Sequence, residues 1–194
     1  ITPENSLVRV RTGSISIEKL VDGGVNHEFC DLFVNNAGEL IVGDKIDARI
    51  YKLSSNNTLE LRAKLLSEKN RNIHITADGN DNLYVAVEDG NLGIYKIDKN
   101  DNVNLVTNQV YYPSSIMFNG DNLLVLSDFP KKISSLTLDG TQKELANIIG
   151  SVQKHLYSLV KFKGVYYYVH NNGSQTEGEL YKLTSSYQSQ KVTQ

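Results

Sequence analysis

A short pattern of apolar runs and Gly/Asn turns recurs four times along the chain, and it constrains the fold more than any other feature. The apolar residues that open the repeats, Leu32, Ile75, Ile116 and Leu159, lie 43, 41 and 43 positions apart. Each repeat continues through a turn, a second apolar strand and a third strand reading Ile-Tyr-Lys-Leu or a variant of it. A repeat of this length built from short strands is typical of β-propeller blades. The sequence therefore predicts an all-β propeller.

The repeat also predicts how the chain is divided. We expect a single propeller domain over residues 1–194, with an outer half blade at 7–22 and blades at 28–66, 72–108, 113–150 and 156–194. About four and a half blades are visible, which fits a five-bladed ring with one thin blade or part of a six-bladed ring. In the second case a missing N-terminal segment or a second chain would complete the ring. The start at Ile1 without Met suggests a processed or truncated product.

Composition narrows the classes of partner. The chain has 20 basic and 22 acidic residues and no basic block, which argues against nucleic-acid binding. No apolar run approaches the ~20 residues that span a bilayer, so no membrane span is expected. The sequons at Asn56 and Asn172 lie in turn-like segments and predict a secreted glycoprotein. Cys30 is the single cysteine; we interpret it as a small buried residue, with a reactive thiol as the alternative.

A ring of polar residues is the best candidate site in the sequence. Ligands of such propellers bind at one end of the central channel, near the starts of the innermost strands. Alignment of the repeats places Asp31, His74, Ser115 and Ser158 at equivalent positions there. We consider them ligand-binding candidates. The alternative is that they satisfy backbone groups and channel water.

Tyrosines add an aromatic component to this candidate site. The chain has 11 Tyr, 5 Phe and no Trp. Tyr112 and Tyr157 precede the third and fourth innermost strands, where they could stack on a planar ligand and bind its polar edge through their hydroxyls. The tyrosines that recur in the third strands, Tyr51, Tyr95 and Tyr181, are interpreted as blade packing.

Signals for catalysis or metal binding are weak. Asp31, His74 and Ser115 are the residue types of a hydrolytic triad, but no nucleophile-elbow motif surrounds a serine. The remaining histidines, at 27, 155 and 170, are not spaced as metal ligands. The acidic segments 78–81 and 98–101 lack the ligand series of a calcium loop and are interpreted as solvated turns. We therefore assign no catalytic and no metal residue.

The segment Pro113-Ser114-Ser115-Ile116, followed by the turn and strand at residues 119–125, resembles NHL, YWTD and gluconolactonase-like propellers. These families enter each innermost strand with a Pro-x-x-apolar step and then a Gly/Asn turn. A gluconolactonase-like site would imply a divalent metal held by Glu, Asn and Asp ligands, for which the chain offers Asp31 and His74, with Glu28 nearby. The chain is also similar to insect ommochrome-binding proteins, which implies pigment binding.

These observations lead to one functional prediction with two alternatives. We expect a non-enzymatic binding protein that holds a small, partly aromatic ligand, or a protein segment, at the mouth of the propeller channel. The first alternative is a gluconolactonase-like hydrolase. Only this alternative requires a cofactor, which would be a divalent metal. The second is a propeller that serves protein interaction alone.

Overall fold

The computed structural model describes residues 5–10, 16–66, 71–88, 93–148, 156–171 and 178–192 as eighteen strands in five sheets. The N-terminal two-stranded sheet contains β1 (Leu7–Val10) and β2 (Ile17–Val21). The first blade contains β3 (Phe29–Val34), β4 (Leu40–Asp44), the short 3-10 helix η1 (Ile46–Ala48), β5 (Arg49–Leu53) and β6 (Leu59–Lys64). The second contains β7 (Asn72–Ala77), β8 (Leu83–Glu88), β9 (Ile94–Ile97) and β10 (Val103–Thr107).

The third and fourth blades have the same four-stranded form. The third contains β11 (Pro113–Phe118), β12 (Asn122–Asp128), β13 (Lys131–Thr137) and β14 (Gln142–Asn147). The fourth contains β15 (Leu156–Phe162), β16 (Val165–Asn171), β17 (Gly178–Leu183) and β18 (Ser189–Lys191). In each blade every strand pairs antiparallel with its neighbours in chain order.

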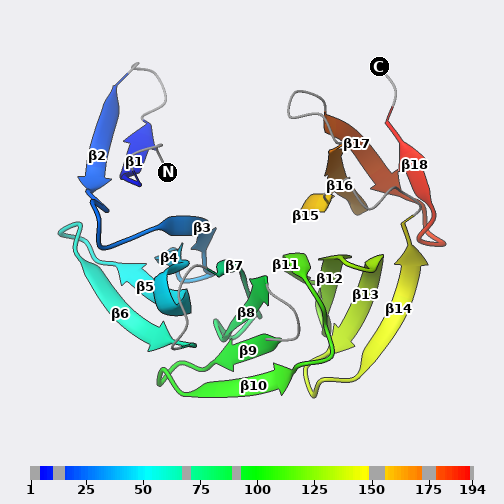
Figure 1. Cartoon of the computed structure of the whole chain (residues 1–194), viewed down its shortest axis with the longest axis horizontal. Helices are drawn as coiled ribbons and strands as arrows, with labels where there is room; N and C mark the ends of the chain where they lie inside the picture. The colour runs from blue at the N-terminus through cyan, green and yellow to red at the C-terminus, as the bar shows by residue number, and fades with distance from the viewer. Residues whose placement is uncertain are drawn as a thin grey trace.

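The blades radiate from a common hub, as a propeller requires (Figure 1). The first strand of each blade, β3, β7, β11 and β15, lies innermost, and the fourth strand lies at the rim. Successive inner strands contact each other, β3 with β7, β7 with β11 and β11 with β15. The predicted all-β propeller is therefore confirmed, with four four-stranded blades and one two-stranded sheet. The size of the complete ring stays a prediction.

The core consists of separate layers between neighbouring blades. One apolar cluster packs the first blade on the second, another the second on the third, and another the third on the fourth. Strand β8 shows why the second strands read as unbroken apolar runs, because residues 83–87 are fully buried between the layers on both its faces. Burial of each Leu or Val side chain among them contributes roughly 1.5–3 kcal/mol.

Asx turns close the hairpins of the second blade. The Asp78 carboxylate accepts hydrogen bonds from the backbone N–H of Asn80 and Asn82, at 2.9 and 3.0 Å. Asp98 repeats this arrangement one hairpin later. The two acidic segments thus use their first carboxylate to hold their own turn. Within the described residues, no helix is long and apolar enough to cross a membrane.

Candidate functional site

A pocket of about 360 Å3 lies at the end of the hub where the inner strands begin. Residues from the starts of β3, β7, β11 and β15 meet there with the last residues of β8 and β12. We call this the hub pocket, and it is lined by Cys30, Asn72, His74, Glu88, Ser114, Asp128, Leu156 and Tyr157. The inner strands of all four blades therefore contribute to one cavity, and its volume is in the range of small-molecule sites.

His74 and Glu88 form the polar centre of the hub pocket. The Nε2 atom of His74 lies 3.7 Å from Oε2 of Glu88, and this buried nitrogen has no hydrogen-bond partner in the described part of the chain. Asn72 donates a hydrogen bond of 2.8 Å to the same carboxylate oxygen. Burial opposes ionisation of Glu88, but the contacts with His74 and Asn72 outweigh it and lower the pKa of the carboxyl. Glu88 is therefore ionised at neutral pH.

Tyr157 and Tyr112, the two predicted stacking residues, lie in different surroundings. Tyr157 lines the hub pocket and is 47% exposed. Tyr112 is 41% exposed but packs edge-on against Phe129, with ring centroids 6.3 Å apart, and does not line the pocket. Of the two tyrosines, only Tyr157 faces the space where a ligand could stack.

Asp31 and Ser115 connect inner strands to each other. Oδ2 of Asp31 accepts a hydrogen bond of 2.7 Å from the backbone N–H of Ile75 on the next blade. The Ser115 hydroxyl likewise accepts one of 2.9 Å from Leu159 N–H. Neither residue lines the hub pocket. These two members of the predicted ring therefore satisfy backbone groups between blades.

The six predicted site residues, the polar ring and the two tyrosines, are thus divided between the hub pocket and its surroundings. His74 and Tyr157 lie in the hub pocket, whereas Asp31, Tyr112, Ser115 and Ser158 do not line it. Ser158 is exposed, with φ 45°, where the β15–β16 register shifts between Tyr157 and Leu159. The role of the six residues in ligand binding stays a prediction.

Of the eight lining residues, only His74 and Tyr157 were predicted, and the missed ones include the two acids Glu88 and Asp128, which lie outside the inner strands. Both are the last residues of second strands, and Asp44 ends the corresponding strand of the first blade. These three acids lie 44 and 40 positions apart, so the repeat itself carried the signal. Asp128 accepts hydrogen bonds from Leu156 N–H at 3.1 Å and Lys131 Nζ at 2.7 Å.

The nucleophile and ligand candidates are mostly engaged elsewhere. Burial raises the pKa of the Cys30 thiol to about 12, so it stays protonated at neutral pH. Glu28 forms an ion pair with Lys45 at 2.7 Å. No group of three His, Cys, Asp or Glu side chains that could hold a metal ion occurs among the described residues. His155 and Asn172 lie outside the described residues.

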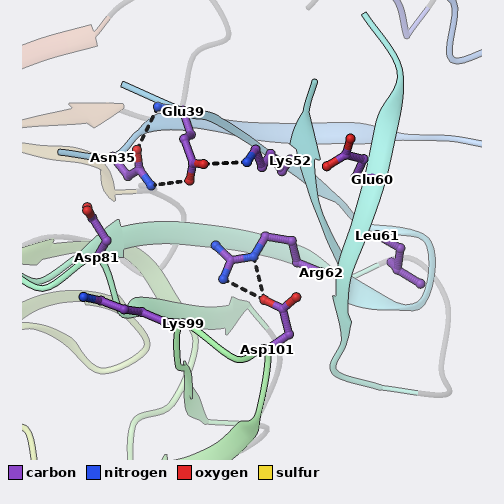
Figure 2. A pocket seen from close by; sticks show the side chains of 9 residues that line it. All are labelled: Asn35, Glu39, Lys52, Glu60, Leu61, Arg62, Asp81, Lys99 and Asp101. Carbon is purple, nitrogen blue, oxygen red and sulfur yellow. Dashed lines mark hydrogen bonds and ion pairs between the residues drawn. The ribbon is translucent and has the colours of Figure 1, made fainter. Parts of the chain in front are cut away.

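A second concave feature, the interblade groove, separates the first and second blades near the turns where their inner strands end. It has a volume of about 470 Å3, and Figure 2 shows seven charged side chains along it, from Glu39, Lys52, Glu60, Arg62, Asp81, Lys99 and Asp101. Lys52 lies 2.5 Å from Glu39 and Arg62 lies 2.6 Å from Asp101. Most of its charge is therefore neutralised within the groove.

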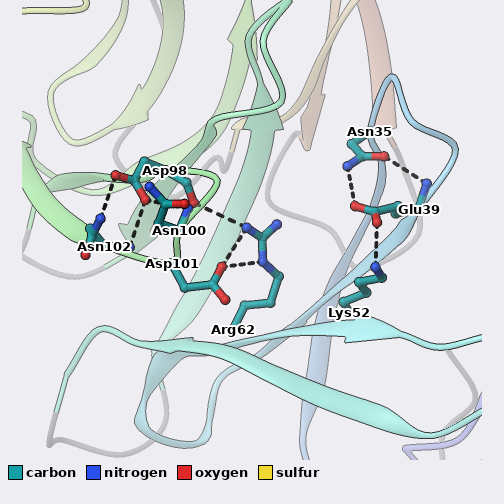
Figure 3. A network of polar contacts seen from close by, with 8 residues as sticks. All are labelled: Asn35, Glu39, Lys52, Arg62, Asp98, Asn100, Asp101 and Asn102. Carbon is teal, nitrogen blue, oxygen red and sulfur yellow. Dashed lines mark hydrogen bonds and ion pairs between the residues drawn. The ribbon is translucent and has the colours of Figure 1, made fainter.

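Arg62 gives the interblade groove a structural role. It extends from β6 of the first blade to the β9–β10 turn of the second, where Nε donates to Asp101 at 2.7 Å and Nη2 to the Asp98 carbonyl at 3.3 Å (Figure 3). The turn is itself held by the Asp98 carboxylate. This network fastens one blade to the next at the rim.

Comparisons with known proteins identify the fold alone. No family model and no curated protein matches the chain. Solved structures that match include streptogramin B lyase, with 15% identity and a TM-score of 0.78 over 97% of this chain and 62% of that one. Virginiamycin B lyase from Staphylococcus aureus matches with 15% identity and a TM-score of 0.77 over 97% and 63%. A putative gluconolactonase matches with 12% identity and a TM-score of 0.72 over 95% and 69%.

The predicted resemblance to gluconolactonase-like propellers is thus confirmed for the fold. The chain spans 62% of the length of streptogramin B lyase and 63% of that of virginiamycin B lyase. Identities of 12–15% carry no conclusion about activity. The similarity to ommochrome-binding proteins stays a prediction.

Proposed function

We propose that this protein binds a small, partly aromatic ligand in the hub pocket without transforming it. The observation that carries the proposal is the buried Nε2 of His74, which lies 3.7 Å from the Glu88 carboxylate and has no hydrogen bond to any described residue, in a pocket to which Tyr157 also contributes. A polar ligand group would meet His74 and Glu88, and a planar group would meet the half-exposed ring of Tyr157. A protein segment with an aromatic side chain at its tip would meet the same groups.

The charges of the hub pocket favour a ligand with a cationic group. Glu88 is ionised, and Asn72, which donates to it, is uncharged. Lys131 already neutralises Asp128 through their 2.7 Å ion pair. When His74 is neutral, the Glu88 carboxylate is the one unbalanced charge among the residues that line the pocket, and an ammonium group of a ligand would balance it.

Calorimetric titration with tyramine, which joins a phenol ring to an ammonium group, tests this proposal. We expect tyramine to bind, and 4-hydroxyphenylacetate, its anionic counterpart, to bind at least about tenfold more weakly. Glu88→Gln should remove the preference for the cation, and Tyr157→Ala should weaken both compounds. Tyr111→Ala, at an exposed tyrosine outside the pocket, is the control. Equal binding of tyramine to all four proteins would contradict the proposal.

Acid–base catalysis is the second candidate function, because an imidazole beside an ionised carboxylate can exchange protons with a substrate. The fold is shared with proteins named as lyases and as a gluconolactonase. A gluconolactonase-like reaction would need a divalent metal, for which His74 and Glu88 are the available hub ligands. Metal analysis together with lactone hydrolysis by the wild type and by His74→Ala separates the two functions. Stoichiometric metal, with turnover that the variant loses, would favour the enzyme.

A further inference from the structure

A third concave feature lies between the third and fourth blades, away from the hub pocket. We call it the aromatic cavity. Its volume is about 500 Å3, and it is lined by Leu145, Ala146, Asn147, Ile148, Tyr168, His170, Tyr181, Ser186, Tyr187, Gln188 and Ser189. It shares no lining residue with the hub pocket.

Among the described residues that line the aromatic cavity there is no Asp, Glu, Lys or Arg. The interblade groove, which also lies between two neighbouring blades, has seven such residues. The floor of the aromatic cavity is buried, with Tyr168 1%, His170 3% and Ile148 7% exposed. The polar residues Ser186, Gln188 and Ser189 are exposed at its rim. An apolar floor under a polar rim is the usual build of a small-molecule site.

Paired tyrosines form the aromatic part of the cavity lining. Tyr168 and Tyr181 are register partners on β16 and β17, so their side chains lie on the same face of the blade. Their rings stack with centroids 5.3 Å apart and an interplanar angle of 12°. The His170 ring meets Tyr181 edge-on at 5.8 Å. Both tyrosine planes are therefore fixed before any ligand arrives.

The opposite wall is aliphatic and comes from the third blade. Leu145 and Ala146 at the end of β14, with Ile148 just after it, face the tyrosines across the cavity. Tyr168 O–H donates to Ser189 Oγ at 2.9 Å, which places a hydroxyl pair beside this apolar space. Aromatic rings from one blade and aliphatic side chains from the other give the cavity a lining that suits an apolar aromatic guest.

We propose that the aromatic cavity is a second ligand site, which takes an uncharged planar aromatic molecule of one to three rings. Insertion between the tyrosine wall and the aliphatic wall removes the apolar faces of such a molecule from water. A charged substituent would lose its hydration without gaining an ion partner among the lining residues. The site thus selects for neutral molecules, whereas the hub pocket selects for cations.

Fluorescence titration with N-phenyl-1-naphthylamine tests the proposal, because this neutral probe emits strongly in apolar surroundings. 8-Anilinonaphthalene-1-sulfonate has the same ring system with an added sulfonate and is the matched charged probe. We expect saturable binding of the neutral probe at one site per chain, and binding of the sulfonate weaker by at least roughly tenfold. No saturable binding of the neutral probe, or equal affinity for both, would overturn the proposal.

Variants then locate the bound probe. Ala146→Phe fills the cavity, and Tyr187→Asn removes a ring while keeping a residue type that tolerates the φ of 58° at this position. Both should abolish binding of N-phenyl-1-naphthylamine, with circular dichroism showing that each variant is folded. His74→Ala in the hub pocket and Phe162→Ser on the exposed face of the fourth blade should bind it like the wild type. Loss of binding in either of these two, with retention in the cavity variants, would overturn the proposal.

The same variants keep this inference separate from the proposed function. Tyramine binding should survive Ala146→Phe, and probe binding should survive Glu88→Gln. Failure of tyramine to bind would contradict the hub proposal alone, and failure of the neutral probe to bind would contradict the cavity proposal alone.

Discussion

At the scale of single residues, polar side chains of the inner strands link neighbouring blades. Asp31 bonds to Ile75, Thr76 Oγ1 accepts from Phe118 N–H at 3.0 Å, and Ser115 bonds to Leu159. At least one such hydrogen bond from an inner strand thus crosses each junction between the four blades. Loss of such a partner leaves a buried N–H unsatisfied.

Asp31 offers the clearest test of this role. Asp31→Ala should lower the free energy of unfolding by about 1–3 kcal/mol, because the Ile75 N–H loses its acceptor, whereas Asp31→Asn keeps an acceptor and should lower it less. Urea unfolding of both variants at neutral pH measures the difference. Equal loss in the two variants would contradict the hydrogen-bond role.

The stability contributed by Asp31 should also depend on pH. Burial raises the pKa of Asp31 and outweighs the hydrogen bonds from Ile75 and Leu32 and the nearby His74. The folded state therefore holds this proton to a higher pH than the unfolded state. The contribution is complete below the unfolded pKa and is lost as the pH rises through the folded pKa. As the pH rises from the unfolded pKa through the folded pKa, Asp31→Asn should gain stability relative to the wild type, and the opposite trend in urea titrations would refute this.

The Cys30 thiol should resist modification in the folded protein. Its pKa of about 12 keeps the reactive thiolate scarce, and its Sγ atom lies 3.6 Å from the Gly43 carbonyl oxygen. With Ellman's reagent near pH 8, we expect a rate on the order of 100-fold below that of the denatured chain. Similar rates would instead support the reactive-thiol interpretation.

Asn56 is the described sequon that could carry a glycan. Its side chain is exposed in the β5–β6 turn, and its Oδ1 accepts a hydrogen bond of 2.8 Å from the Thr58 hydroxyl. Since Oδ1 is the atom engaged, Nδ2 is left for attachment. Protein made through a eukaryotic secretory pathway should lose mass on treatment with peptide N-glycosidase, and Asn56→Gln should reduce that loss. An unchanged mass would contradict the predicted glycosylation of this sequon.

At the scale of elements, the turn between β13 and β14 fits closely against a neighbouring blade. Gly140 has φ 97°, and a Cβ atom there would lie 2.4 Å from the carbonyl oxygen of Val106 on β10. Gly38 has a similar φ of 78° but open space around it. Substitution of either glycine by alanine would therefore strain the backbone, and of the two only Gly140 would also bring a Cβ atom into collision with Val106.

Gly140→Ala should accordingly destabilise the protein more than Gly38→Ala. We expect a loss of about 1 kcal/mol for Gly38→Ala, from the left-handed backbone alone, and 1–3 kcal/mol more for Gly140→Ala. Thermal or urea unfolding of the two variants provides the comparison. Equal losses would show that the turn does not press on β10.

Sequence periodicity predicted the elements well because each blade repeats the same alternation of apolar strand and Gly/Asn turn. It predicted the site less well, since pocket geometry depends on strand pairing. Register shifts at the starts of β3, β11 and β15, absent from β7, are not visible in the sequence. Glu88, the last residue of β8, pairs with Asn72, the first residue of β7, at the open end of their hairpin, and this pairing brings Glu88 to the hub pocket. Alignment of the inner strands alone could not reveal that contact.

At the scale of the whole molecule, the core is divided into layers that have no residues in common. The layer between the first two blades and the layer between the last two are separate clusters. Arrays in which each repeat contacts only its neighbours can lose structure locally.

A destabilising substitution in the fourth blade should therefore loosen only that blade and the strand packed against it. Leu156→Ala removes a fully buried side chain from the last layer and should cost about 2–5 kcal/mol there. Hydrogen exchange followed by mass spectrometry should become faster in β14–β18 while β3–β6 keep their protection. Uniformly faster exchange would instead indicate a single cooperative unit.

The two proposed ligand sites both take residues from one strand pair, β15 and β16. Leu156, in the hub pocket, lies opposite His170, in the aromatic cavity, in the β15–β16 register. If a guest in one site shifts either of these strands, it also changes the fit of the other site. Thermodynamics then requires reciprocity: whatever factor tyramine imposes on the neutral probe, the probe imposes on tyramine.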